Sequence, residues 1–311
     1  MRVSPFSTET EGGSRTTLTK PSSPYRLRAS EWLSAFKATG KEFLADDCFG
    51  LAQQIAFSSL LAFFPSVILV VGLLGLIGPG AYDSLVHLLG TVAPKAVLDA
   101  IDLAKRSSTG SSAGPSIALT VGVVGAVWAA SGATNSIIKA VNRASDLEET
   151  RPFWKVRLLA LTLVVLSGLG TATVFVLIVF GGPLGDAIAR RADLGHSFTV
   201  VWNALRWPIA FGGILLFFAT VYWIAPNREL RNWKWLTPGS VLGAVLWLAL
   251  SALFSLFTSY SSSYDRTYGS LAGAIILLLW LNYSAVALLL GAELNAELER
   301  RAGTRSRGTS P

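Results

Sequence analysis

The sequence predicts an all-α, polytopic membrane protein in which six transmembrane helices form one bundle with short interfacial helices. Two features of the composition indicate this class: 51% of the 311 residues are hydrophobic and only 14% are charged, whereas soluble domains average about 25% charged residues. The third observation is a series of long stretches without charge. Each is close to or longer than the roughly 20 residues that a helix needs to cross a bilayer.

The N-terminal part of the chain precedes the first uncharged stretch. Residues 1–24 lack an apolar stretch and are rich in Ser, Thr, Gly and Pro, which is typical of disorder and not of a signal peptide. In residues 25–47, apolar and charged residues alternate at helical spacing, which predicts an amphipathic helix on the membrane surface. We expect a transmembrane domain over 25–301 and a disordered cytoplasmic tail over 302–311.

Six uncharged stretches predict the six spans in order. They are residues 48–82, 115–138, 158–185, 207–227, 235–264 and 271–290. We expect Pro65 to kink the first span, and residues 83–112 to form two short interfacial helices broken at Pro94.

Small residues share one face of several predicted spans, and such faces let neighbouring helices approach closely. In the fifth span, Gly or Ser recurs every fourth residue over 239–259, except for Trp247, and the sixth carries a similar stripe that ends at Asn295. Ala287 lies outside that stripe, so we expect it to tolerate a larger side chain. The residues predicted to pack helices are Pro65, Gly122, Gly125, Gly132, Gly269, Gly273 and Gly291.

The net charge of +7 is explained by membrane topology. With six spans, 19 of the 26 Lys and Arg residues fall on the side of the termini and seven on the other side. Loops rich in Lys and Arg stay in the cytoplasm, so we expect both termini to be cytoplasmic and the membrane to be the bacterial inner membrane. This explanation makes nucleic acid an unnecessary partner.

Polar side chains at the predicted cytoplasmic side are the candidates for a functional site. Arg143, Arg151 and Arg157 cluster between the second and third spans, where guanidinium groups suit phosphate-bearing head groups. The alternative is that these charges only set topology and form local salt bridges. Asn135 and Asn142 lie one heptad apart and predict either a polar path or interhelical hydrogen bonds.

Glu293 and Glu297 lie one helical turn apart after the sixth uncharged stretch. Paired carboxylates can relay protons. The alternative is that both are solvated or paired with basic residues such as Arg143 or Arg151, because they lie at the membrane edge.

An enzyme is not expected. Cys48 is the one cysteine, and the two histidines, His87 and His196, are far apart in sequence. This cysteine and these histidines predict neither a cysteine metal cluster nor a Ser-His-Asp arrangement. The glycine-rich stretches lack the lysine of a phosphate-binding loop. The sequence predicts no metal site and no cofactor.

Four segments carry a resemblance to a known family. They are Ala52–Phe57 with Phe64-Pro65, Asn142–Ala144 with Glu148–Trp154, Ala225–Arg228, and Thr267–Ser270 with Gly291–Glu297. Because these four segments occur in this order, the chain resembles the YihY/BrkB family of bacterial inner-membrane proteins over residues 30–300. The resemblance implies six spans and no established catalytic residues. Of the older family labels, ribonuclease BN is a misassignment and virulence factor describes a phenotype.

The sequence therefore favours a protein that transports or handles a lipid or an anionic amphipathic substrate in the cell envelope. A structural or scaffold membrane protein is the alternative, and a membrane-associated ribonuclease is a more distant one. Membrane lipids are the expected partners, with envelope proteins and further copies of the chain as other candidates.

Overall fold

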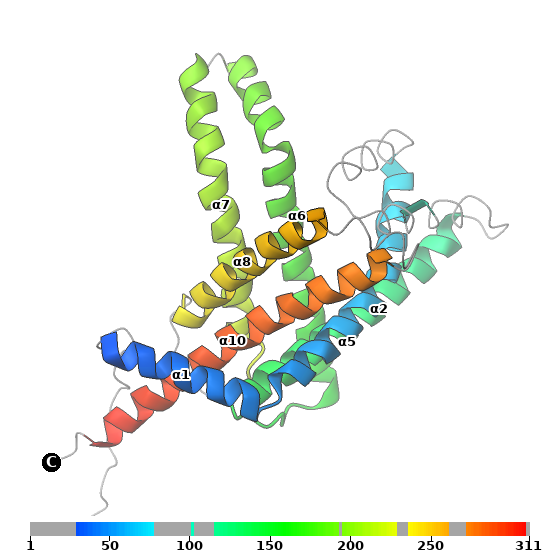
Figure 1. Cartoon of the computed structure of the whole chain (residues 1–311). Coiled ribbons are helices and arrows are strands. Elements are labelled where there is room, and N and C mark those ends of the chain that lie inside the picture. The colour runs from blue at the N-terminus through cyan, green and yellow to red at the C-terminus, as the bar shows by residue number, and fades with distance from the viewer. Residues whose placement is uncertain are drawn as a thin grey trace, which may run out of the picture.

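The structure is a computed structural model of the chain, and it describes residues 29–77, 101–102, 115–192, 195–228, 236–260 and 272–308. The regular secondary structure of these residues is helical, as predicted (Figure 1). The helices are α1 (Ala29–Ala45), α2 (Cys48–Ile77), α5 (Pro115–Ala144), α6 (Phe153–Ala192), α7 (Gly195–Ile224), α8 (Pro238–Tyr260) and α10 (Ala272–Gly308).

Among the described residues, five helices are long and apolar enough to cross a membrane. Their spans are Cys48–Leu69, Phe153–Gly170, Ser197–Ile224, Pro238–Phe257 and Ala272–Arg301, which correspond to the first and to the third through sixth predicted spans. The second predicted span lies in α5, where polar residues such as Ser131, Thr134 and Asn135 interrupt the apolar run. The count of six spans therefore stays a prediction.

Some predictions fall outside the described residues. This holds for the N-terminal segment 1–24, for nearly all of the two interfacial helices expected over 83–112, and for Gly269. At the other end, α10 continues to Gly308, beyond the position at which we placed the end of the transmembrane domain.

Helix α10 is the centre of the assembly, since α1, α2, α5 and α8 all pack against it. Figure 1 shows α1 crossing the C-terminal half of α10, while α6 and α7 rise away from the other helices as a long antiparallel pair. The predicted amphipathic helix is α1: Ala35 is buried against α10, and Leu33, Phe36 and Leu44 are exposed on its other side. That exposed apolar face fits the predicted membrane-surface position.

The small-residue stripes of the fifth and sixth predicted spans face each other in α8 and α10. A Cβ atom at Gly239 or at Gly291 would collide with the backbone oxygen of the other glycine, so the two helices cross here at backbone contact. Further along, the Trp247 indole donates to Ser284 Oγ at 3.0 Å and the Trp280 indole donates to Ser251 Oγ at 3.2 Å. These reciprocal hydrogen bonds fix the register of the pair.

Helices α2 and α5 form a second close pair. Ser58 and Ser136 are hydrogen bonded at 3.1 Å, and a Cβ at Gly125 would lie 3.8 Å from the Pro65 side chain. A Cβ at Gly132 would meet no described atom within 4 Å, so close approach does not require glycine there. Gly122 and Gly273 lie within α5 and α10.

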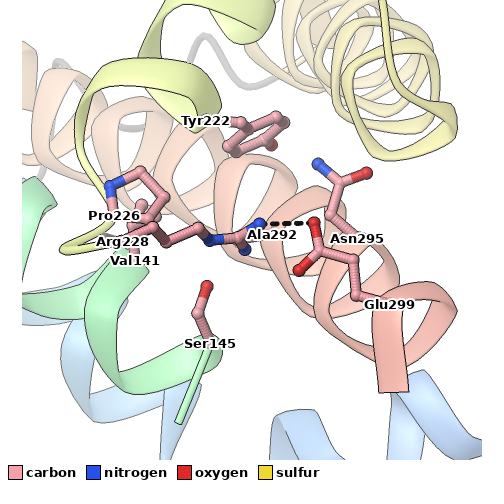
Figure 2. A pocket seen from close by; sticks show the side chains of 8 residues that line it. All are labelled: Val141, Ser145, Tyr222, Pro226, Arg228, Ala292, Asn295 and Glu299. Atoms are coloured by element: carbon pink, nitrogen blue, oxygen red, sulfur yellow. Dashed lines mark hydrogen bonds and ion pairs between the residues drawn. The ribbon is translucent and has the colours of Figure 1, made fainter. Parts of the chain in front are cut away.

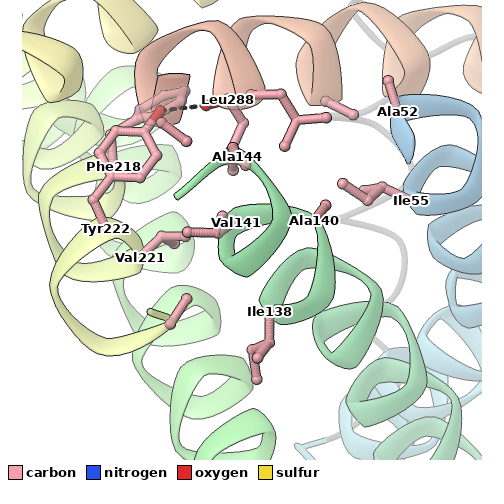
Figure 3. Packing of buried hydrophobic residues seen from close by; sticks show 14 of the residues in the cluster. Ala52, Ile55, Ile138, Ala140, Val141, Ala144, Phe218, Val221, Tyr222 and Leu288 are labelled. Atoms are coloured by element: carbon pink, nitrogen blue, oxygen red, sulfur yellow. Dashed lines mark hydrogen bonds between the residues drawn. The ribbon is translucent and has the colours of Figure 1, made fainter. Parts of the chain in front are cut away.

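A core of small and branched side chains joins α2, α5, α7 and α10, as Figure 3 shows around Val141, Tyr222 and Leu288. The expectation for Ala287 was wrong: this residue is completely buried. The helical wheel placed Ala287 between two packed faces of α10, but the neighbouring helices cover this position as well, so a larger side chain has no free space there.

Candidate functional site

Apart from Asn135, further back on α5, and Arg157, which contacts Trp128 there, the sequence-predicted polar residues gather where α5 and α7 end, α6 begins, and α10 passes from Glu293 to Arg301. We call this region the inner end, because the basic residues predict that it faces the cytoplasm. Two aspartates shape it. Asp47, between α1 and α2, and Asp146, just after α5, both adopt positive φ angles of 50° and 53°. Aspartate tolerates this left-handed conformation, which ends a helix and turns the chain.

The turn after α5 is held by a pair of backbone hydrogen bonds. The Leu147 N–H donates to the Asn142 carbonyl at 2.9 Å, and the Asp146 N–H donates to the Arg143 carbonyl at 3.0 Å. This is a Schellman motif with Asp146 at its left-handed position. It directs residues 147–152 back across the end of α5 toward α7.

Arg151 is bound within the protein by this returning loop. Its guanidinium donates to both carboxylate oxygens of Glu149, at 2.7 and 2.6 Å, and to the Ala225 carbonyl at the end of α7, at 2.9 Å. The Arg151 side chain is 18% exposed. Paired hydrogen bonds between a guanidinium and a carboxylate are strong and fix geometry.

Asn142 and Asn227 extend the same network. The Asn142 amide donates to Glu149 Oε2 at 2.9 Å and accepts from the Asn227 backbone N–H at 2.8 Å. The Asn227 side chain donates to the Glu148 carbonyl and to Thr150 Oγ1, both at 2.8 Å. We call Asn142, Glu149, Arg151 and Asn227 the Arg151 clamp, because together they join α5, the loop after it and the end of α7.

The clamp sets the charge of its carboxylate. The hydrogen bonds from the Arg151 guanidinium lower the pKa of Glu149 below its ordinary value, because they stabilise the ionised form. The clamp is thus ionised and internally paired near neutral pH. Asn135, the other residue of the predicted polar path, is half-buried on α5.

The other two predicted arginines lie apart from the clamp. The Arg143 side chain is 62% exposed and forms an ion pair with Asp46 at 3.3 Å. The Arg157 guanidinium lies 4.2 Å from the centre of the Trp128 ring and donates to the Trp128 carbonyl at 3.3 Å. The structure therefore places the three arginines with three different partners.

The two predicted carboxylates of α10 also differ from each other. Glu297 forms ion pairs with Arg301 at 2.5 Å and with Arg300 at 3.3 Å. Glu293 is completely buried and accepts a hydrogen bond from the Cys48 thiol at 3.4 Å. The expectation of pairing thus holds for Glu297, through arginines of its own helix. The prediction that Glu293 is solvated was wrong, because α2 packs over that part of α10.

A pocket opens to solvent at the inner end between α5, α7 and α10 (Figure 2). Its volume is about 250 Å³ including the open mouth. We call it the Arg228 pocket, and its lining residues are Val141, Ser145, Tyr222, Pro226, Arg228, Ala292, Asn295 and Glu299.

The polar groups of the Arg228 pocket are few and differ in how firmly they are held. The Tyr222 hydroxyl donates to the Leu288 carbonyl at 2.6 Å, and the Asn295 amide oxygen accepts from the Gly239 N–H at 2.9 Å. Arg228 pairs with Glu299 at 2.5 Å, and both side chains are partly exposed. Figure 2 shows the Ser145 hydroxyl pointing toward the Arg228 guanidinium. The pocket therefore presents an arginine at its opening, with a carboxylate as its partner.

The sequence did not single out Arg228, Glu299 or Glu149 as site residues. Arg228 closes one of the four segments that carry the family resemblance, and that is the signal which could have identified it. Its pairing with Glu299 joins residues 71 positions apart, and nothing in the local sequence indicates such a contact.

Comparisons with known proteins agree with the membrane fold. YfkH of Bacillus subtilis (strain 168), described as a ribonuclease-like protein, is 31% identical over 80% of the chain and 90% of its own length. A UPF0761 membrane protein of Stenotrophomonas maltophilia (strain R551-3) is 28% identical over 82% of the chain, which spans only 58% of that relative. No solved structure matches. The family model described as virulence factor BrkB matches residues 39–311, and the chain belongs to the BrkB/YihY family of membrane proteins.

Proposed function

We propose that this membrane protein binds and moves, or otherwise handles, an anionic amphipathic substrate, with phosphate-bearing lipids as its chemical class. The observation that supports the proposal is the Arg228 pocket. An arginine stands at its opening, and an anionic head group can take the place of Glu299 as partner of the guanidinium. Arginine is well suited to this task because its planar fork matches phosphate geometry.

The position of the pocket favours a lipid over a soluble metabolite. It lies near the ends of the candidate membrane spans of α7 and α10. A ligand with its charged head in the pocket and its apolar tail along the helices fits this arrangement.

We further propose the bacterial inner membrane as the location, with both termini in the cytoplasm. The excess of Lys and Arg on the side of the termini supports this orientation. It places the Arg228 pocket at the cytoplasmic leaflet, where anionic lipids supply a negative surface potential.

A scaffold role is the second candidate. It is favoured by the close crossing of α8 and α10 at Gly239 and Gly291, which is typical of a rigid bundle. The name of YfkH also raises a ribonuclease, but among the described residues that line the pocket Glu299 is the one carboxylate, and it is paired with Arg228. A lipid-handling role makes better use of these two side chains.

The test compares lipids that remain bound after gentle solubilisation, measured by native mass spectrometry. We expect Arg228→Ala to lower retention of anionic lipid about ten-fold, since a charge-assisted hydrogen bond is worth about 1.5–3 kcal/mol. Arg228→Lys should restore part of it. Arg143→Ala is the matched control, because it removes an exposed arginine at the same end of the protein. Equal lipid profiles for the wild type and Arg228→Ala would refute the proposed site and favour the scaffold.

A further inference from the structure

Glu293 is a buried carboxyl group that the Arg228 pocket does not use. Its side chain is completely buried on the face of α10 that contacts the start of α2. Oε1 accepts a hydrogen bond from the Cys48 thiol at 3.4 Å. Oε2 is also buried, and it has no hydrogen-bond partner among the residues that the structure describes.

The charged groups around Glu293 come from every element that meets there. The nearby cations are already paired: Arg300 with Asp146 and Glu297, and Arg143 with Asp46. Within the described residues, no ion pair is formed by Glu293 itself. The ionisable groups that act on Glu293 or on its thiol partner are Asp46 and Asp47 from the turn between α1 and α2, Cys48 from α2, Asp146 from the end of α5, and Arg300 from α10.

An ionised carboxylate in this position would be costly. Burial of an unpaired charge costs far more than burial of a neutral hydrogen-bonding group. Asp46 and Asp146 add repulsion to a negative charge on Glu293, against the attraction of Arg300. A bound proton removes both penalties. A protonated carboxyl also keeps an oxygen that can accept the hydrogen bond from the Cys48 thiol.

We infer that Glu293 is a proton-binding site, and that uptake and release of its proton are coupled to the Arg228 pocket. The two sites share one rigid helix. Ala292, Asn295 and Glu299 line the pocket from α10, and at about 100° per residue Glu293 lies roughly opposite Asn295. Loss of the proton requires water or a cation at the buried Oε2. Separation of α10 from the start of α2, which contacts Oε1 through Cys48, would admit water or a cation and would shift the pocket residues.

The coupling rests on the proposed function, whereas the proton site does not. Infrared difference spectroscopy of the purified protein in sodium-free buffer tests the site alone. We expect wild type near neutral pH to give a protonated-carboxyl band that Glu293→Gln loses. Glu297→Gln is the matched control: its carboxylate lies one turn away and is ion-paired, so the band should remain. A band unaffected by Glu293→Gln would overturn the inference, as would one that sodium abolishes, since this would indicate a cation site.

Cys48→Ala is the variant to use if Glu293→Gln does not fold. It removes the thiol donor to Oε1, so the carboxyl band should persist at a shifted frequency. A band at an unchanged frequency would assign it to another carboxyl group and overturn the inference.

Lipid retention then tests the coupling. Retention of anionic lipid by the wild type should change several-fold between mildly acidic and mildly alkaline buffer, and Glu293→Gln should abolish this pH dependence. If wild type retains anionic lipid equally at both pH values, the coupling is wrong although the proposed function stands. If it retains none at either pH, the proposed function fails, and the infrared band alone decides the proton site.

Discussion

Arg151 and Arg228 lie at the same end of the molecule and carry the same charge, but they have different surroundings. Arg151 donates to both oxygens of Glu149 and to the Ala225 carbonyl, so it joins the loop after α5 to the end of α7. Within the part of the chain that the structure describes, Arg228 pairs with one carboxylate, Glu299, at the edge of an open pocket. The number of partners and their position in the chain, more than charge alone, therefore separate a structural arginine from one that is available to a ligand.

The comparison predicts a large difference in stability. Arg151→Ala removes the guanidinium that pairs with Glu149 and donates to the Ala225 carbonyl, and we expect a loss of about 2 kcal/mol in the free energy of unfolding. Arg228→Ala breaks one partly exposed ion pair and should cost less than about 1 kcal/mol. Thermal unfolding in the same detergent measures both, with Arg143→Ala as control. Equal destabilisation by Arg151→Ala and Arg228→Ala would remove the distinction between clamp and pocket.

Asn142 tests whether the clamp acts as a unit. Asn142→Ala removes the hydrogen bond to Glu149 and leaves the half-buried Asn227 N–H without its acceptor, for an expected cost of about 1–2 kcal/mol. Residues in one network are not additive. The double variant Asn142→Ala with Arg151→Ala should therefore lose less stability than the two single losses added together. Strict additivity would mean that the hydrogen bonds act independently.

The sequence predicted the helices well, because long uncharged stretches have few alternatives to a membrane helix. The facing stripes of α8 and α10 were also visible, since Gly239, Gly291 and the serines recur at helical spacing. The site was less predictable. Arg143, Arg151 and Arg157 are equivalent as charges in a sequence, and their different partners depend on how distant segments meet in the folded chain.

Burial was the other property that the sequence did not reveal. Glu293 and Glu297 both follow the last uncharged stretch, yet one is enclosed by α2 and the other pairs with two arginines. Position along a helix predicts depth in the membrane, but it does not predict which neighbour covers a given face. The same limit explains why Ala287 was misjudged.

Acid should weaken the clamp. The pKa of Glu149 lies below its ordinary value because Arg151 stabilises the carboxylate. The clamp therefore adds stability above the unfolded-state pKa of about 4.3, and this contribution disappears as the pH falls through the lower pKa of the folded protein. We expect the stability difference between the wild type and Glu149→Gln to shrink on acidification in this range. A constant difference would show that ionisation of Glu149 does not contribute.

The smallest effect on stability, and the sharpest test of the pocket, is expected from Glu299. Its side chain is 43% exposed, so Glu299→Gln should change the free energy of unfolding by less than about 0.5 kcal/mol. In the proposed site Glu299 competes with the head group for the Arg228 guanidinium, and a neutral glutamine competes less well. Retention of anionic lipid should therefore rise a few-fold in Glu299→Gln, and the double variant with Arg228→Ala should lose that gain, because the arginine is then absent. Native mass spectrometry measures both.

Glu148→Gln is the control, since it removes an exposed carboxylate from the loop of the clamp, away from the pocket lining. A rise of the same size in this control would reflect the general loss of negative charge at the inner end. It would mean that Arg228 is not the group that binds the lipid.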